Sequence, residues 1–211
     1  MNPIRYVRVD SRKTESGNFE TGFVAAYKEA FGGPPYNEVY TDEQVIGEVW
    51  NPHLERGIVV LALDADVVVG FGCAKPIRLA PQDVQDFLAE RQRAGVFPVN
   101  LHNLWYMSEI GVLNRYRGQG IGLQLVRHRL IWINERGMTH KLDGGNFVMR
   151  TAVRDSNSVR IYSSIGAKQL PGLQDVSDSD QVLVNKSQSN ERVYLFGSCD
   201  LALWKIAEIS R

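Results

Sequence analysis

The pattern of apolar and polar positions predicts strands and helices that alternate along the chain. Continuous or alternating apolar residues, many of them β-branched, mark strands, and apolar residues three or four positions apart mark helices. The expected strands are 7–9, 58–63, 67–74, 104–112, 147–153 and 193–203. The expected helices are 19–30, 41–50, 81–94, 121–136 and a short helix that follows the turn 155–157 and runs to about 165. The sequence therefore predicts an α/β fold.

Several boundaries of these elements can be predicted from single residues. Thr41 and Gln44 have the spacing of a capping box, and Pro52 is expected to end the helix that begins there. The segment Asp64-Ala65-Asp66 separates two apolar runs, which predicts an antiparallel hairpin. Glycines are expected to end the three later helices: Gly95, Gly137 and Gly166.

The length of 211 residues fits a single domain, 1–211, and the polar stretch at about 174–190 is interpreted as an insertion or a loop. Lysine plus arginine (24) balance aspartate plus glutamate (24), so no global field draws the chain to nucleic acid or to an anionic membrane. No apolar run has the length of a signal peptide or a bilayer span.

Cysteine and histidine positions favour neither a disulfide framework nor a metal site. The two cysteines, Cys73 and Cys199, lie far apart in the sequence, which fits a reducing cytoplasm. No histidine has the His-x-x-x-His spacing that a metal site would use, and we therefore expect no metal.

The turn Arg117-Gly118-Gln119-Gly120-Ile121-Gly122 leads from a buried strand into a helix. Backbone N–H groups at a helix start bind anions, and glycines let the backbone approach a phosphate closely. No Lys-Ser/Thr pair follows, which excludes a Walker loop, and Leu123 replaces the third glycine of the dinucleotide motif. Taken alone, the turn is either a phosphate cradle or a tight structural turn.

The flanks of this turn carry a specific resemblance. Glu109-Ile110-Gly111-Val112 precedes it, and Tyr116-Arg117-Gly118-Gln119-Gly120-Ile121-Gly122 contains it. Together they resemble the acetyl-CoA loop of the GNAT N-acetyltransferase superfamily, Arg/Gln-x-x-Gly-x-Gly/Ala. A second signature of that family is matched by Asn157, Tyr162 and Gly166, although Ala167 stands where a large apolar residue is usual.

The resemblance implies a fold and a mode of acetyl-CoA binding. The fold is a mixed, twisted sheet with helices on both faces, whose parallel strands Trp105–Val112 and Phe147–Val153 are splayed to admit the pantetheine; the cofactor core is about 104–167. The backbone of the strand pairs with the pantetheine arm, and loop N–H groups hold the pyrophosphate. The implied binding residues are Ile110, Gly111, Val112, Arg117, Gly118, Gln119, Gly120, Ile121, Gly122, Leu123 and Asn157. Many members of the family form homodimers.

Two side chains are candidates for proton transfer. Tyr162 is placed near the sulfur by the resemblance and is the candidate acid for the departing thiolate; otherwise it is a packed helix tyrosine. Glu109 lies in an apolar strand directly before the cofactor segment, where burial suits it to accept a proton from the amine. Its alternative role is a carboxylate that reaches solvent or pairs with an arginine. The N–H near Val112 is expected to polarise the thioester carbonyl.

Three functions remain open from the sequence. The first is acetyl transfer from acetyl-CoA to a primary amine in a direct ternary complex. The second is a catalytically silent acyl-CoA sensor, and the third is acetylation of protein N-termini or lysines. For the two transferase functions the expected acceptor is a small-molecule or peptide amine. The segment Phe31–Glu38 either flanks the acceptor site or only ends the preceding helix with a turn.

Overall fold

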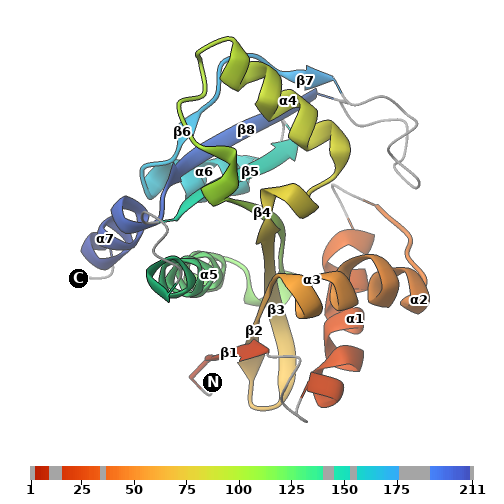
Figure 1. Ribbon diagram of the computed structural model, residues 1–211. Coiled ribbons are helices and arrows are strands. Elements are labelled where there is room, and N and C mark those ends of the chain that lie inside the picture. Colours follow the sequence, from red (N-terminus) through yellow and green to blue (C-terminus); the bar gives the residue numbers. More distant parts are fainter. Residues whose placement is uncertain are drawn as a thin grey trace. The chain divides into compact units, whose positions relative to one another are not determined.

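The computed structural model describes residues 3–9, 16–33, 37–139, 145–152, 156–175 and 191–209. The chain divides into two compact units, whose elements are labelled in Figure 1. The first includes Met1–Ala74 and Glu109–Arg129, and the second includes Lys75–Ser108, Leu130–Val182 and Ser187–Arg211. Strand β4 (Leu104–Val112) and helix α5 (Ile121–Thr139) contribute residues to both units.

The first unit contains the predicted N-terminal strand and hairpin. Strands β1 (Arg5–Val9), β2 (Ile58–Asp64) and β3 (Val67–Pro76) pair antiparallel, and β4 follows β3 in the order β1-β2-β3-β4. Ala65 takes a positive φ of 52° in the tight turn between β2 and β3. The predicted hairpin is therefore confirmed.

Among the helices of this unit, α1 packs its aromatic residues on β3. The helices are α1 (Ser16–Gly32), α2 (Asp42–Gln44), the π-helix η1 (Val45–Trp50), α3 (Asn51–Arg56) and the short 3₁₀ helix η4 (Asn114–Tyr116). The rings of Phe23 and Tyr27 on α1 lie 5.1 and 5.4 Å from the ring of Phe71 on β3. Burial of these rings holds α1 on the strand.

The second helical segment begins as predicted but ends later. Thr41 Oγ1 accepts from the Gln44 N–H at 3.2 Å, and the Gln44 side chain accepts from the Thr41 N–H at 2.9 Å, which confirms the capping box. The prediction that Pro52 ends the helix is wrong, because α3 continues to Arg56. Pro52 lies in the first turn of α3, a position where proline is tolerated.

The second unit contains the parallel pair of the sheet. Strand β5 (Asn146–Ala152) runs parallel to β4, and the other pairs are antiparallel: β8 (Glu191–Ser198) with β5, β6 (Lys168–Gln169) and β7 (Gln174–Asp175). Its strand order is β4-β5-β8-β6. The β4–β5 ladder covers Leu104–Met107 and Asn146–Met149, although both strands run further, as the predicted splay requires. The predicted mixed α/β fold is confirmed.

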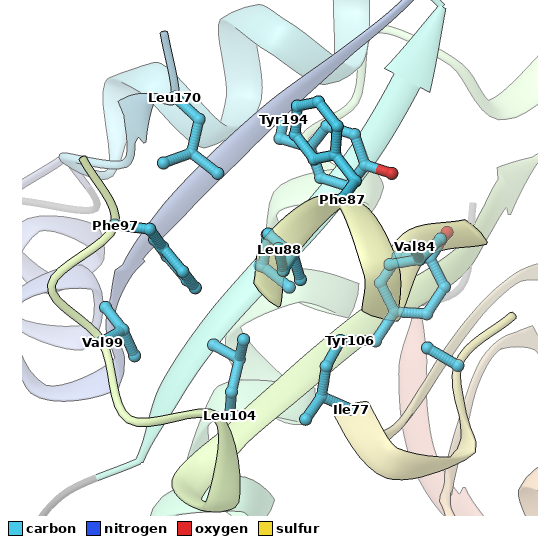
Figure 2. Close-up of a cluster of buried hydrophobic side chains, with 12 residues drawn as sticks. Ile77, Val84, Phe87, Leu88, Phe97, Val99, Leu104, Tyr106, Leu170 and Tyr194 are labelled. Atoms are coloured by element: carbon cyan, nitrogen blue, oxygen red, sulfur yellow. The ribbon is translucent and has the colours of Figure 1, made fainter. Parts of the chain in front are cut away.

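A buried apolar cluster joins helix α4 (Gln82–Arg93) to strands of this unit. Figure 2 shows Val84, Phe87 and Leu88 of α4 among side chains of β4, β8 and the connecting segments. The ring of Phe87 stacks on that of Tyr194 with centroids 4.5 Å apart. Gly95, at φ 72°, follows the helix end, as predicted. The short helices η2 (Ile77–Leu79) and η3 (Leu101–Asn103) flank α4 in sequence.

Polar side chains connect the same elements. Arg150 on β5 pairs with Asp83 on α4, and its Nη1 also donates to Gln174 Oε1 at 3.3 Å. Gln174 Nε2 donates to the Asp83 carbonyl at 3.1 Å, and the Tyr194 hydroxyl donates to Gln174 Oε1 at 2.5 Å. These bonds satisfy groups that are costly to leave unpaired away from water. They link α4 with β5, β7 and β8.

Two helix boundaries near the C-terminal side were predicted wrongly. Helix α5 passes through Gly137 to Thr139, because an interior glycine costs a helix only about 1 kcal/mol. The predicted final strand 193–203 ends at Ser198, and helix α7 (Cys199–Ile209) follows. Cys199, Ala202 and Ile206 of α7 are buried at helical spacing, which explains why this stretch is not a strand.

Helix α6 (Ser156–Ser164) agrees with the predicted short helix, and Gly166 follows it at φ 85°. The end of the predicted strand at Val153, Asp155 of the predicted turn, and residues 176–190 of the predicted insertion lie outside the described residues. Within the part that is described, none of the helices combines the length and the apolar character that a bilayer crossing would need.

Candidate active site

The glycine turn forms an open cradle at the start of α5. Gly118 and Gly120 have positive φ values of 76° and 78°, and a Cβ added at either would meet no atom within 4 Å. The N–H of Gln124 donates to the Gly120 carbonyl at 3.1 Å, so the N–H groups of Ile121–Leu123 precede the first helical bond and point out of the helix end. Free space beside unpaired N–H groups fits a phosphate ester.

Side chains of the turn fix it to neighbouring backbone. Arg117 Nε donates to the Val112 carbonyl at 3.0 Å, and Gln119 Nε2 donates to the Arg115 carbonyl at 3.3 Å. The Tyr116 hydroxyl donates to Asp64 Oδ2 at 2.8 Å, which links the turn to strand β2. These three hydrogen bonds tie the turn to the preceding backbone and to β2.

The end of β4 is packed so closely that only glycine fits at position 111. A Cβ at Gly111 would lie 2.6 Å from Cε1 of Phe71 and 3.0 Å from the Ala30 Cβ. On the adjacent strand, a Cβ at Gly70 would lie 3.1 Å from the Gly111 carbonyl oxygen. Phe71 and Ala30 therefore pack closely on Gly111, and this packing fixes the backbone of the segment Ile110–Val112.

Replacing Gly111 with alanine should lower the free energy of unfolding by about 1–3 kcal/mol, because the new methyl group overlaps a buried ring. Urea unfolding followed by circular dichroism measures this change. Gly47→Ala is the matched control, since a Cβ at Gly47 meets nothing within 4 Å inside a helical segment, and it should be neutral or stabilising. Equal stability of the two variants would show that the contact is not tight in solution.

The backbone of Glu109 is held by a buried arginine. Arg129 on α5 is 0% exposed, and its Nη1 donates to the Glu109 carbonyl at 3.1 Å and to the Cys73 carbonyl at 2.9 Å. A Cβ at Gly72 would lie 2.8 Å from Arg129 Nε, so glycine leaves room for the guanidinium. The guanidinium of Arg129 on α5 thus connects β3 and β4 at Glu109, the residue before Ile110–Val112.

The side chain of Glu109 has a tyrosine partner that the sequence did not reveal. The hydroxyl of Tyr27, 4% exposed on α1, donates to Glu109 Oε2 at 3.5 Å, a long hydrogen bond. Burial, and then the nearby Glu109 carboxylate, strongly raise the pKa of Tyr27, so the phenol stays protonated. Tyr27 falls on the apolar stripe of its helix, and a helical pattern cannot distinguish a packed ring from a hydrogen-bonding one.

Residues of the second signature lie on α6 in the second unit. Asn157 is exposed, and its Oδ1 accepts from Arg160 Nη2 at 3.2 Å. Tyr162 is 1% exposed, and its ring lies 5.8 Å from that of Phe147 on β5. The Ala167 N–H donates to the Tyr162 carbonyl at 3.0 Å, which closes the helix end at Gly166. The ring is therefore firmly packed within this unit.

The predicted site residues thus fall into two groups. Glu109, Ile110–Val112 and Arg117–Leu123 lie together in the first unit, and Asn157 and Tyr162 lie in the second. The first group combines a strand end, an open glycine turn and a carboxylate within one short stretch of chain.

A comparison with protein-family models matches residues 23–154, more than half of the chain, to the acetyltransferase (GNAT) family. The chain belongs to the GNAT acetyltransferase family. This GNAT protein is accordingly an acetyl-CoA-dependent N-acetyltransferase. The open glycine turn at the start of α5 fits the phosphates of that co-substrate.

Solved structures of acetyltransferases share the fold of this GNAT protein. The ribosomal-protein-S18-alanine N-acetyltransferase from Escherichia coli is 10% identical, with a TM-score of 0.59 over 93% of this chain and 94% of that one. An N-acetyltransferase from Staphylococcus aureus Mu50 is 12% identical, with a TM-score of 0.60 over 92% and 99%. The ribosomal-protein-alanine N-acetyltransferase from Brucella melitensis is 16% identical, with a TM-score of 0.58 over 93% and 99%. No curated protein sequence gave a significant match.

Proposed function

We propose that this GNAT protein transfers the acetyl group of acetyl-CoA directly to a primary amine bound beside it in one ternary complex. The observation that carries the proposal is the position of Glu109, whose carboxylate immediately precedes the cofactor segment and lies in the same unit as the phosphate cradle. A carboxylate so close to the thioester end of the binding strand can take a proton from the attacking amine.

The co-substrate would be held mainly by backbone. Ile110, Gly111 and Val112 would pair with the pantetheine arm, and the N–H groups of the glycine turn would bind the pyrophosphate. Arg117 is exposed and donates through its Nε to the Val112 carbonyl, and the rest of its guanidinium would assist in binding the pyrophosphate. Asn157 would add a contact from α6. The residues proposed for the phosphate cradle are Arg117, Gly118, Gln119, Gly120, Ile121, Gly122 and Leu123.

The chemistry requires two proton transfers. Glu109 removes a proton from the acceptor ammonium, and the freed amine nitrogen attacks the thioester carbonyl, which the N–H of Val112 polarises. The new C–N bond forms as the C–S bond breaks, and the Tyr162 hydroxyl gives its proton to the departing sulfur. Alignment of the two reactants in one complex supplies a large part of the rate.

Thermal melting with acetyl-CoA tests the proposed binding site, with NAD and ATP as phosphate-bearing controls. Acetyl-CoA at about a hundred times its Kd adds about 2.7 kcal/mol to the free energy of unfolding. For a chain of this size, Tm rises by roughly 5–10 °C. No rise, or an equal rise with all three ligands, would mean that the turn does not select acyl-CoA, and the proposal would then be withdrawn.

A pair of glycine variants localises the binding. Gly120→Asp places a carboxylate in the cradle, where it repels phosphate, and a tenfold weaker Kd would reduce the stabilisation to about 1.4 kcal/mol. Gly95→Asp is the matched control, because Gly95 also has a positive φ, 72°, and open space around a Cβ. Aspartate tolerates this backbone conformation better than most residues. Only Gly120→Asp should show this reduced stabilisation by acetyl-CoA.

The acceptor is best identified by a panel of small primary amines and peptides with free N-termini or lysines, with thiol release as the readout. Turnover with small amines alone would assign a small-molecule acceptor, and turnover with peptides alone would assign a protein acceptor. Absence of turnover with either, despite acetyl-CoA binding, would contradict the proposed transfer.

A further inference from the structure

Arg129 is a charged residue in the core of the first unit. Among the described residues, its side chain and that of His53 are the only polar or charged ones that are buried, and Arg129 is 0% exposed. Removing a charge from water costs free energy, and an apolar residue of similar volume is often as stable at such a place. Stability alone is therefore a poor reason for an arginine at this position.

The guanidinium contacts three backbone carbonyls. Its Nη1 donates to the Cys73 carbonyl at 2.9 Å and to the Glu109 carbonyl at 3.1 Å, and its Nε donates to the Leu125 carbonyl at 3.3 Å. Cys73 lies on β3, Glu109 lies on the neighbouring strand β4, and Leu125 lies one turn into α5. Arg129 thus ties the helix that begins at the glycine turn to the strand end that precedes the turn.

The Glu109 carbonyl and the Ile110 N–H belong to one peptide group. This group is planar and trans, so a carbonyl that is fixed on Arg129 makes the Ile110 N–H point away from Arg129. On β4 the ladder with β5 ends at Met107, so this N–H is not part of that ladder. A cation at the carbonyl oxygen also polarises the peptide and makes its N–H a stronger hydrogen-bond donor.

The same contact bears on two functional groups. Ile110 is the first residue of the segment proposed to pair with the pantetheine arm, and the side chain of Glu109, the proposed base, leaves the adjacent Cα. A tilt of this peptide would therefore displace the N–H and the carboxylate together.

We propose, on the basis of the function proposed above for Glu109 and Ile110–Val112, that Arg129 is a positioning residue for acetyl transfer. It acts through the peptide between Glu109 and Ile110 and contacts neither substrate. It aims the Ile110 N–H at the pantetheine arm, and it sets the place from which the Glu109 carboxylate meets the amine.

Arg129→Met tests the proposal, because it removes the charge and keeps an unbranched side chain in the core. The Kd for acetyl-CoA, obtained from the rise in Tm with ligand concentration, should increase about tenfold, which corresponds to one hydrogen bond. The kcat per folded molecule should fall about tenfold or more, since a small misplacement of a reacting group is costly. A residue with a purely structural role would instead lower Tm and the folded fraction, and would leave Kd unchanged.

The two parts of the result are separate. A folded Arg129→Met enzyme with the parental Kd would overturn the action on Ile110, and one with the parental kcat would overturn the action on Glu109. Arg129→Lys keeps a cation with N–H donors but not the planar guanidinium, so its Kd and kcat should lie between those of the parent and of Arg129→Met. Arg127→Met, on the exposed side of α5, is the control and should behave like the parent.

Gly72→Ala displaces the guanidinium without changing Arg129. The new Cβ would lie 2.8 Å from Arg129 Nε and 3.2 Å from its Cδ, so the side chain has to shift from its carbonyl partners. Kd should rise and kcat should fall, each by less than in Arg129→Met, while the control Gly47→Ala changes neither. If Arg129→Met fails to fold, a Gly72→Ala enzyme with the parental Kd and kcat overturns the proposal by itself.

Combination with Glu109→Gln separates this proposal from the proposed base. If Arg129 places the base, Arg129→Met should lower kcat little further once residue 109 is glutamine, while Kd still rises about tenfold. Fully additive losses of kcat would contradict an action through Glu109. If Glu109→Gln alone keeps the parental rate, the base assignment fails, and a raised Kd in Arg129→Met still supports the action on Ile110.

Discussion

Replacing Glu109 with glutamine should lower kcat about a hundredfold, because general base catalysis contributes at least that factor in many enzymes. Glutamine has the same shape but cannot accept a proton from an ammonium. The Arg129 side chain binds the backbone carbonyl of residue 109, which the substitution does not change, so the strand should keep its position. The pH profile of kcat/KM should also lose its acidic limb, and the acetyl-CoA-dependent rise in Tm should remain.

Glu43→Gln is the control for this result. Glu43 is an exposed carboxylate in the first turn of α2, and no part of the proposed mechanism uses it. Its loss should leave kcat and the pH profile unchanged. A Glu109→Gln enzyme that keeps the parental rate and pH profile would show that another group, or solvent, deprotonates the amine.

Replacing Tyr162 with phenylalanine should also lower kcat, by about a hundredfold, while the response of Tm to acetyl-CoA stays near that of the parent. The ring of Tyr162 is 1% exposed and lies against Phe147, so phenylalanine keeps the packing and loses only the hydroxyl. The departing sulfur would then have to leave without its proton donor. Steady-state kinetics with thiol detection, together with melting, measure both effects.

Ser164→Ala is a suitable control on the same helix. The Ser164 hydroxyl donates to the Ile161 carbonyl at 2.8 Å on the exposed side of α6, and it has no proposed catalytic part. Its removal should leave kcat unchanged. If Tyr162→Phe turns over as fast as Ser164→Ala, the hydroxyl is not the acid, and Tyr162 is a core residue of the second unit.

The glycine turn before α5 illustrates what local sequence can predict about backbone conformation. Gly118 and Gly120 were expected to let the backbone approach an anion, and both have positive φ with open space around them. The Thr41–Gln44 capping box and the turn at Ala65 were predicted equally well. Each of these features depends on residues within a few positions, so spacing alone specifies the backbone geometry.

Helix boundaries were predicted less well where tertiary burial opposed a local signal. Pro52 and Gly137 both disfavour a helix interior, yet helical structure continues through each of them. In α7, the buried residues Ala202 and Ile206 stabilise a helix where apolar residues alone suggested a strand. An interior glycine costs a helix only about 1 kcal/mol and proline is tolerated in a first turn, so the burial of an apolar face can outweigh these local signals.

By itself, the sequence determined the glycine turn, the strand that precedes it and the family to which both belong. The surroundings of Glu109 were decided only by the tertiary structure. Tyr27 lies 82 positions from Glu109 in sequence and Arg129 lies 20 positions away, and no local spacing relates the three. The aromatic packing of α1 on β3 brings Tyr27 to the carboxylate of Glu109, and the glycine at position 72 leaves room for the guanidinium that binds its backbone carbonyl. Contacts of this kind come from packing between distant segments, so a pattern along the chain cannot predict them.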